Sequence, residues 1–372
     1  MDLQKIRGPA IFAASFIVVY LLCCVPLVAL LVGYVGKIVV STFVGVTVSF
    51  FLKSQLDKLF NGDRKTTVNP SRKAVFISGC DTGFGHELAL RLHRLGFYVY
   101  AGCLFPDQEG GRKLRERGSD GRLRVVACDV TDTRQVNECA QRIREELQKL
   151  KIDLWAVVNN AGVASLSEFE WIPTEVYEKI LNVNSLGSVR VIKAFLPQLR
   201  QKCGRIVIVA SLSGRYAIPG FTGYSMSKHA QVALADGLRR ELRKFNIQVC
   251  LVEPGSYKTQ LADSTLIMKE VQRHWELLSE ETKTSYTPEY YENFISHLGI
   301  LADDTNPNIS EPVDAIVEAV TSTSPRLRYV PGTFAVKLRG FFMPLLPSRV
   351  QDLLLSKLSI GLLLPPSADQ VE

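Results

Sequence analysis

Residues 74–85 read AVFISGCDTGFG and decide the fold of this 372-residue chain. Residues 74–77 form a short apolar run that is typical of a buried strand, and three glycines follow before a helical pattern begins. Glycine lets the backbone turn sharply and approach a ligand closely, and the helix that follows offers unpaired N–H groups to a pyrophosphate. We therefore predict a phosphate-binding turn at these glycines. An ordinary turn between strand and helix is the alternative, because the spacing G-x-x-x-G-x-G differs from the commoner G-x-G-x-x-G.

Strand and helix patterns alternate along the rest of the chain. Further strand-like runs occupy residues 97–101, 123–127, 154–158, 205–209 and 248–252. Short buried strands that alternate with helices are typical of a parallel sheet covered on both faces. Because crossovers between parallel strands are right-handed, we predict an α/β fold with a doubly wound parallel sheet of the Rossmann type. The predicted catalytic domain spans residues 73–330.

Composition is ordinary for a globular protein. The net charge is +7, but the Lys and Arg residues are scattered among Asp and Glu without a basic block, so we expect no nucleic-acid partner. The eight cysteines show no paired metal-ligand spacing. They are typical of reduced residues in a core or a membrane, and we predict neither a metal site nor a disulfide framework.

The first 60 residues are strongly apolar. Residues 8–36 and 38–52 carry no charge, and Lys37 alone separates them. The first stretch is long enough to cross a hydrocarbon core of about 30 Å. We predict a membrane anchor over residues 1–60, and one span or two spans both remain open. A buried core helix is the alternative.

Basic residues flank this anchor on both sides, which favours a hairpin with both ends in the cytosol. The uncharged N-terminus is unlike an Arg- and Ser-rich transit peptide. We therefore expect the endoplasmic reticulum membrane, with a mitochondrial membrane as the alternative. The polar residues 61–72 are predicted to link the anchor to the catalytic domain.

A phenol and an amine lie four residues apart at Tyr224 and Lys228. On a helix the two side chains project from one face. An ammonium group beside a phenol stabilises the phenolate, which lets the tyrosine take a proton from an alcohol while a hydride leaves the carbinol carbon. Ser211 follows the strand-like run 205–209, where an open α/β sheet places its chemistry. A Tyr–Lys pair at this spacing is common by chance, so its interpretation depends on the other motifs.

Five motifs occur in the order and approximate spacing of the short-chain dehydrogenase/reductase family. They are Gly79-x-x-x-Gly83-x-Gly85, Asn159-Asn160-Ala161-Gly162, Ser211, Tyr224-x-x-x-Lys228 and Pro254-Gly255. The chain resembles this family strongly over residues 72–260 and less specifically to about residue 350. Residues 79–85 and 100–104 are most similar to the branch that contains retinol dehydrogenases, oxidative hydroxysteroid dehydrogenases and 3-hydroxybutyrate dehydrogenase.

The resemblance implies catalytic roles. Tyr224 would be the general base, Ser211 would bind the substrate oxygen, and Lys228 would hold the nicotinamide ribose and tune Tyr224. Asn184 would order a water that links Lys228 to solvent, and Asn182 is the weaker candidate for that role. Relatives often associate through the helices that bear Asn184 and Tyr224, so a homodimer is a family-level expectation.

The resemblance also implies cofactor contacts, with adenine near Asp129 and Val130 and with Asn159 lining the cofactor channel. The expected cofactor-binding residues are Gly79, Asp81, Gly83, Phe84, Gly85, Asp129, Val130, Asn159, Ala161, Gly162, Tyr224, Lys228, Pro254 and Gly255.

We predict NAD rather than NADP as the cofactor. Relatives that prefer NADP usually carry a basic residue in the glycine turn or after the second strand, where it pairs with the 2′-phosphate. This chain has Asp81 in the turn and Gly102-Cys103 after the strand, and a carboxylate would repel that phosphate. Capping of the following helix is the alternative role of Asp81. Because cellular NAD is mostly oxidised, NAD dependence favours alcohol oxidation.

Residues 256–308 are rich in aromatic side chains and follow Pro254-Gly255, after which this family places its substrate cover. We predict a helical lid that suits a large apolar alcohol; packing of the lid on the core is the alternative explanation of the aromatics. Residues 331–372 form an apolar C-terminal segment, expected either on a bilayer surface or packed on the catalytic domain.

Together these features predict a membrane-bound, NAD-dependent oxidoreductase that converts a steroid or retinoid hydroxyl into a carbonyl. A 3-hydroxybutyrate-type dehydrogenase is one alternative. A catalytically silent NAD-binding scaffold is another, and it would predict damage to the Ser–Tyr–Lys set, whereas Ser211, Tyr224 and Lys228 are all present.

Overall fold

The computed structural model describes residues 39–51, 66–303 and 305–356, and the chain divides into two units after Thr66. In the first unit, residues 39–51 form a helix. No helix among the described residues combines the length and the apolar character that a bilayer crossing requires. The apolar stretch over residues 8–36 lies outside the described residues, so the membrane anchor stays a prediction.

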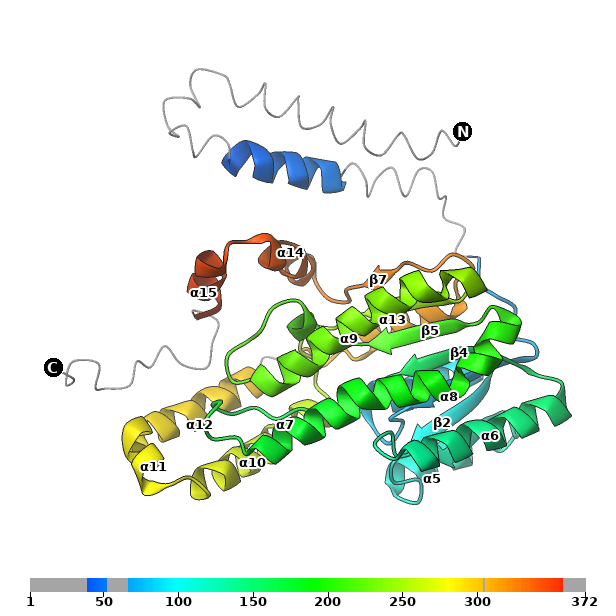
Figure 1. The fold of residues 1–372 in the computed structure, drawn as a ribbon, viewed down its shortest axis with the longest axis horizontal. Helices are drawn as coiled ribbons and strands as arrows, with labels where there is room; N and C mark the ends of the chain where they lie inside the picture. Colours follow the sequence, from blue (N-terminus) through cyan, green and yellow to red (C-terminus); the bar gives the residue numbers. More distant parts are fainter. Residues whose placement is uncertain (1–38, 52–65, 304, 357–372) are drawn as a thin grey trace. The chain divides into compact units, whose positions relative to one another are not determined.

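The second unit is built on a seven-stranded parallel sheet with the strand order β3-β2-β1-β4-β5-β6-β7 (Figure 1). The strands are β1 (Lys73–Ser78), β2 (Tyr98–Cys103), β3 (Leu123–Ala127), β4 (Asp153–Asn159), β5 (Arg205–Val209), β6 (Gln248–Val252) and β7 (Arg328–Tyr329). The first strand, β1, lies inside the sheet. The chain then runs outward through β2 to β3 and returns to β4 on the other side of β1. This doubly wound topology confirms the predicted α/β fold. The two residues of β7 are too few to form a recognisable apolar run, and the sequence does not predict them as a strand.

Helices cover both faces of the sheet (Figure 1). Successive side chains of a strand point to opposite faces, so Val75 and Ile77 belong to one apolar cluster and Ala74 and Phe76 to the other. This double burial explains why the β1 run is continuously apolar. The helices on the Phe76 face are α6 (Thr133–Leu150), α8 (Gly187–Lys202) and α9 (Thr222–Glu241), and those on the Val75 face are α4 (Gly83–Arg94), α5 (Glu109–Arg117) and α13 (Ser310–Thr321).

Short helical segments also occur between the longer elements. A five-residue π-helix, η1 (Asn182–Leu186), joins α7 (Thr174–Leu181) to α8. The 3₁₀ turns are η2 (Leu212–Gly214), η3 (Leu242–Phe245), η4 (Gln260–Ala262) and η5 (Met343–Leu345).

The predicted lid is helical and consists of α10 (Ser264–Glu276), α11 (Glu280–Tyr286) and α12 (Pro288–Asp303). Its aromatic rings surround Trp171, which precedes α7; the rings of Trp275 and Phe294 both lie 5.0 Å from the Trp171 ring. Trp171 is buried, and Tyr286, Tyr290 and Tyr291 join the same cluster. The packing explanation therefore accounts for these aromatics, and they give no evidence of a substrate pocket.

The described part of the C-terminal segment comprises α14 (Phe334–Phe342), η5 and α15 (Ser348–Ser356). Met343 and Leu355 pack with Leu212 and Tyr216 in a separate apolar cluster. The segment therefore packs on the catalytic unit up to residue 356, and residues 357–372 lie outside the described residues.

Arg205, the first residue of β5, forms hydrogen bonds with the end of α13. Its guanidinium is buried, donates to the carbonyl oxygens of Ala319 (2.6 Å) and Val320 (2.9 Å), and lies 5.0 Å over the Trp155 ring. The last carbonyls of a helix lack partners within the helix, and Arg205 supplies a donor to both of these; the Val320 oxygen also accepts from the Trp155 indole N–H (2.9 Å).

We expect Arg205→Met to lower the free energy of unfolding by about 1–3 kcal/mol, because the Ala319 carbonyl loses its donor in a buried setting, whereas the Val320 carbonyl keeps the Trp155 N–H. Urea denaturation followed by circular dichroism measures the change. The matched control Arg117→Met alters an exposed side chain and should change stability by less than about 0.5 kcal/mol. Equal, small effects of both variants would contradict this role of Arg205.

Candidate active site

The predicted site residues gather where parallel strands end. The glycine turn follows β1, Asn159 ends β4, Ser211 follows β5 and Pro254 follows β6. Because these four strands are neighbours and run in one direction, their carboxyl ends lie along one edge of the sheet. The ends of β5 and β6 are in direct contact, since the carbonyl oxygen of Pro254 accepts a hydrogen bond from the Ser211 hydroxyl (3.4 Å).

Helix α9 carries Tyr224 and Lys228 to the same edge. The Lys228 amine lies 5.3 Å from the centre of the Tyr224 ring and donates to the carbonyl oxygen of Val209, the last residue of β5 (3.1 Å). The Ser211 hydroxyl forms a hydrogen bond with Tyr224. The structure therefore brings together the serine, the tyrosine and the lysine that the sequence singled out.

Burial governs the ionisation of this pair. It raises the pKa of Tyr224 to about 12, against a smaller lowering by the hydrogen bond from Ser211. Burial also lowers the pKa of Lys228 to about 7. The expectation that Lys228 lowers the tyrosine pKa is therefore wrong for the protein without a ligand, because removal from water favours the neutral form of each group.

The glycine turn has the conformation that the sequence predicts. Gly79 has a φ of 72°, and a Cβ at Gly85 would lie 2.2 Å from the Gly79 carbonyl oxygen, so both positions require glycine. Thr82 begins α4 without capping it through its side chain. The first N–H groups of the 12-residue α4 thus lack a side-chain cap and suit an anion such as a pyrophosphate.

The turn also contacts residues 257–260, which precede the first lid helix, α10. The Phe84 ring lies 5.9 Å from the Tyr257 ring, and the Thr82 hydroxyl donates to the Gln260 carboxamide in η4 (2.9 Å). Gly83 faces the Thr259 side chain, which a Cβ at Gly83 would meet at 3.7 Å. The turn and residues 257–260 therefore form one contact surface.

Asp81 does not cap α4. Its carboxylate accepts hydrogen bonds from the backbone N–H groups of Leu104 (3.0 Å) and Phe105 (2.8 Å), directly after β2. The capping alternative is therefore wrong. The carboxylate is instead held between the glycine turn and the end of β2.

Residues 159–162 brace the glycine turn. The Asn160 carboxamide donates to the carbonyl oxygens of Ser78 (3.1 Å) and Gly79 (2.9 Å), and the Ser78 hydroxyl accepts from the N–H groups of Asn160 and Ala161 (3.1 Å each). Sequence reasoning gave Asn160 no role of its own, although it lies in the quoted motif. The Asn159 carboxamide is buried and has no hydrogen-bond partner among the described residues. An orphaned amide at this edge and an uncapped helix start both fit a bound dinucleotide.

The side chains of the predicted adenine region are engaged within the protein. Asp129 accepts from the N–H and the hydroxyl of Thr131 (2.8 Å each). Val130 is buried and packs against Gly187 at the start of α8. Their contact with adenine stays a prediction.

Asn184 lies in η1 and is fully buried. Its carboxamide pairs with both backbone groups of Val163 (2.8 Å each) and donates to the Ser227 hydroxyl (2.8 Å), one residue before Lys228. The Asn182 carboxamide instead accepts from Arg190 (2.8 Å), away from this network.

Two side chains donate hydrogen bonds to the main-chain oxygen of Asn184. It accepts from the Gln231 carboxamide (2.7 Å) and from the Ser188 hydroxyl (2.7 Å). The role of Asn184 in ordering a water stays a prediction. Sequence reasoning missed Gln231.

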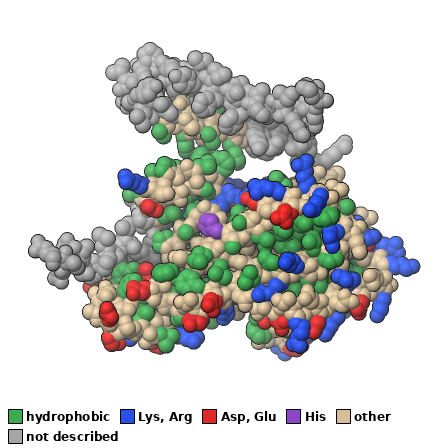
Figure 2. Space-filling model, viewed as in Figure 1, with side chains coloured by type: hydrophobic (Ala, Val, Ile, Leu, Met, Phe, Trp, Pro, Cys, Tyr) green, Lys and Arg blue, Asp and Glu red, His purple; other side chains and the backbone are tan. Residues whose placement is uncertain are grey.

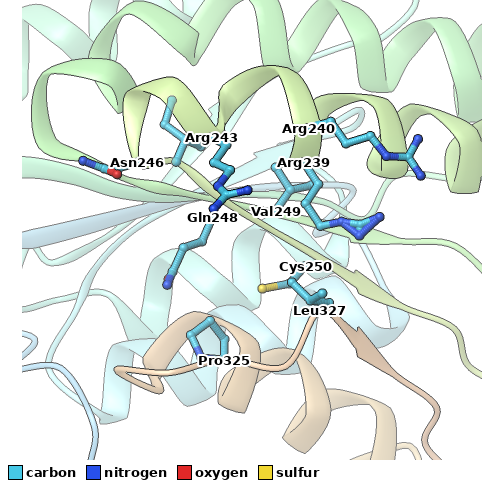
Figure 3. Close-up of a pocket in the computed structure, with 10 residues that line it drawn as sticks. Arg239, Arg240, Arg243, Asn246, Gln248, Val249, Cys250, Pro325 and Leu327 are labelled. Atoms are coloured by element: carbon cyan, nitrogen blue, oxygen red, sulfur yellow. The ribbon is translucent and has the colours of Figure 1, made fainter. Parts of the chain in front are cut away.

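A separate cleft of about 740 Å³ lies at the opposite edge of the sheet (Figure 3). It is lined by the first residues of β6 and by Arg239, Arg240 and Arg243, and none of the predicted site residues lines it. The cleft is thus distinct from the site at the carboxyl ends of the strands.

The surface charge is mixed. On the face drawn in Figure 2, basic side chains are interspersed with acidic ones.

Known proteins resemble the chain well beyond these motifs. Short-chain dehydrogenase/reductase family 9C member 7 of Mus musculus is 38% identical over 82% of this chain and 93% of the relative. Retinol dehydrogenase 7 of Mus musculus is 35% identical over 80% and 92%, and the mitochondrial D-beta-hydroxybutyrate dehydrogenase of Rattus norvegicus is 34% identical over 76% and 83%.

A solved short-chain dehydrogenase/reductase from Burkholderia phymatum, in complex with NAD, shares the fold with a TM-score of 0.58 at 22% identity, over 73% of this chain and 94% of that one. Residues 73–269 match the family model described as short chain dehydrogenase. The chain therefore belongs to the short-chain dehydrogenase family and is an oxidoreductase.

Proposed function

We propose that this protein oxidises a lipophilic alcohol, a steroid or a retinoid, to the carbonyl compound with NAD as the hydride acceptor. One observation carries the proposal: Ser211, Tyr224 and Lys228 are in mutual reach at the edge of the sheet that also bears the glycine turn. A hydroxyl, a phenol and an amine so arranged are suited to bind an alcohol oxygen and to remove its proton.

Each side chain has a distinct task in this reaction. Ser211 orients the alcohol oxygen, and Tyr224, to which Ser211 is hydrogen-bonded, accepts the hydroxyl proton. Lys228 favours the phenolate when it is charged. Bound NAD would supply the hydride acceptor, held at its pyrophosphate by the glycine turn and the start of α4.

Asp81 supports NAD over NADP. Two backbone N–H groups fix its carboxylate beside the end of β2, so a negative charge is held next to the turn. A 2′-phosphate placed there would be repelled and would find no arginine in residues 79–85.

The substrate class is supported by relatives and by the N-terminal sequence. One relative is named for retinol, and the similarity to it covers 80% of this chain. The uncharged stretch within residues 8–52 supports a membrane anchor, which we place in the endoplasmic reticulum. A lipophilic alcohol partitions into the same bilayer. Another relative is named for D-beta-hydroxybutyrate, so a short hydroxy acid is the second candidate substrate. That substrate would favour a mitochondrial membrane, because this relative is named as mitochondrial.

We expect membranes that carry the protein to reduce NAD when supplied with one member of a panel of retinoids, hydroxysteroids and 3-hydroxybutyrate. Absorbance at the NADH band measures turnover, and the activity should sediment with the membranes. Tyr224→Phe should lower kcat by about 10²–10⁴-fold, because the general base is removed, and should leave NADH binding intact. Turnover of the short acid alone would contradict the substrate class, and turnover by Tyr224→Phe would contradict the proposed base.

We expect Asp81→Asn to reduce discrimination against NADP by about tenfold, because the repulsive charge is lost while an acceptor remains for one of the two loop N–H groups. The ratio of kcat/KM for NAD to that for NADP measures this effect. Asp132→Asn, which changes the N-cap of α6 to another good cap, is the matched control and should leave the ratio unchanged. An unaltered ratio in Asp81→Asn would remove the argument for NAD.

The pH dependence follows from the two pKa values. The active form needs the Tyr224 phenolate and the Lys228 ammonium, whose pKa values in the free protein are about 12 and about 7. Below about pH 7 the phenolate fraction rises with pH at constant ammonium, whereas above it the gain in phenolate and the loss of ammonium cancel. We therefore expect kcat/KM for NAD to rise with pH and to level off near pH 7. A decrease of kcat/KM between about pH 5 and 7 would be incompatible with these assignments.

A further inference from the structure

Gln231 bridges the catalytic lysine and the π-helix. It lies on α9, three residues after Lys228, and is fully buried. Its carboxamide oxygen accepts from the Lys228 amine (2.9 Å), while its nitrogen donates to the main-chain oxygen of Asn184 (2.7 Å) and to the Ser188 hydroxyl (3.0 Å). One side chain thus joins the amine to the segment that the resemblance connects to it through water.

The hydrogen bonds of the amine can be counted. A lysine ammonium has three N–H donors, and the Val209 carbonyl and Gln231 take two of them. The third N–H is left for a ligand. The Ser188 hydroxyl completes the cluster by donating to the same oxygen of Asn184 (2.7 Å).

The groups that surround the amine are mostly neutral. Val209 faces it from β5, Gly162 from the loop after β4 (a Cβ there would lie 3.7 Å from the amine), and Gln231 from α9 itself. Tyr224, whose ring centre lies 5.3 Å away, is the titratable neighbour on α9, and Asn184 faces it from η1 without charge. Without a carboxylate in contact, the orientation and charge of the amine depend on these neutral acceptors.

We propose that Gln231 is a positioning residue that fixes the Lys228 amine and couples it to Asn184 in place of a water molecule. The inference rests on the proposed function, because it assigns Lys228 a part in the reaction. A carboxamide that accepts at oxygen and donates at nitrogen holds a neighbouring amine in one place, which exchangeable water does not.

A purely structural role is the competing explanation, and the chain offers a matched control for it. Gln198 on α8 is also buried, and its carboxamide donates to the carbonyl oxygen of Ala140 on α6 (3.3 Å). None of its described hydrogen bonds involves the catalytic residues. Replacement by Met keeps the length of either side chain and removes its hydrogen bonds.

The test measures kcat/KM for NAD against pH in the wild type, Gln231→Met and Gln198→Met. Loss of an acceptor disfavours the ammonium, so in Gln231→Met the pH at which the profile levels off should fall by about one unit, and kcat/KM at neutral pH should fall about tenfold. Gln198→Met should keep the wild-type profile even where its thermal midpoint falls. Gln231→Glu places a carboxylate beside the amine and should shift the levelling-off to higher pH. Unshifted profiles in both Gln231 variants would overturn the inference.

Crystal structures of the wild type and Gln231→Met separate this inference from the proposed function. If the wild type oxidises no alcohol of the panel, the proposed function fails, and the position of the amine still decides the role of Gln231. We expect the amine to leave the Val209 carbonyl in the variant, or to be joined to Asn184 by a newly bound water. An amine that keeps its wild-type place with no such water would reject the positioning role. If Gln231→Met does not fold, Gln231→Glu alone decides the pH experiment, and Gln231→Leu takes the place of Gln231→Met in the crystal structure.

Discussion

Burying an amine without a carboxylate beside it is the constraint on which the site depends. An ammonium group loses its hydration inside a protein, and here two neutral oxygens, from Val209 and Gln231, replace part of that hydration. Incomplete replacement explains why the pKa of Lys228 falls to about 7. The sheet supplies Val209, the last residue of β5, where the pairing with β4 has already ended at Ile208. Helix α9 supplies Gln231, three residues after the amine. The reactive pair therefore exists only in the folded chain.

The sequence predicts the architecture well because the strands are buried on both faces. Such strands appear as continuous apolar runs, and the six runs that the sequence shows coincide with β1 to β6. Strand β7 pairs with β6 over only two residues, too short for a recognisable pattern. The aromatics of the lid show the limit of composition: Trp275 and Tyr291 are as suitable for an internal core as for a pocket, and only their packing around Trp171 decides between the two.

Within the site, local motifs predict which residues meet but not how each one bonds. Ser211, Tyr224 and Lys228 come together because strand ends and helix periodicity fix their places. Gln231 was missed although Lys228 lies three residues before it, because its other partner, Asn184, lies 47 residues away. Asn160 was missed because its partner Gly79 lies 81 residues away. The direction of the Tyr224 pKa was wrong for a related reason: charge proximity is visible in a sequence, whereas desolvation depends on all surrounding segments.

The contact between the glycine turn and residues 257–260 links the region proposed for the nucleotide to the start of the lid. Phe84, Gly83 and Thr82 touch Tyr257, Thr259 and Gln260, the residues from which the lid helices start. Under the proposed function, a dinucleotide bound at the turn would also contact the base of the lid, and any effect of the nucleotide on the affinity for the alcohol would be matched by an equal effect of the alcohol on the affinity for the nucleotide.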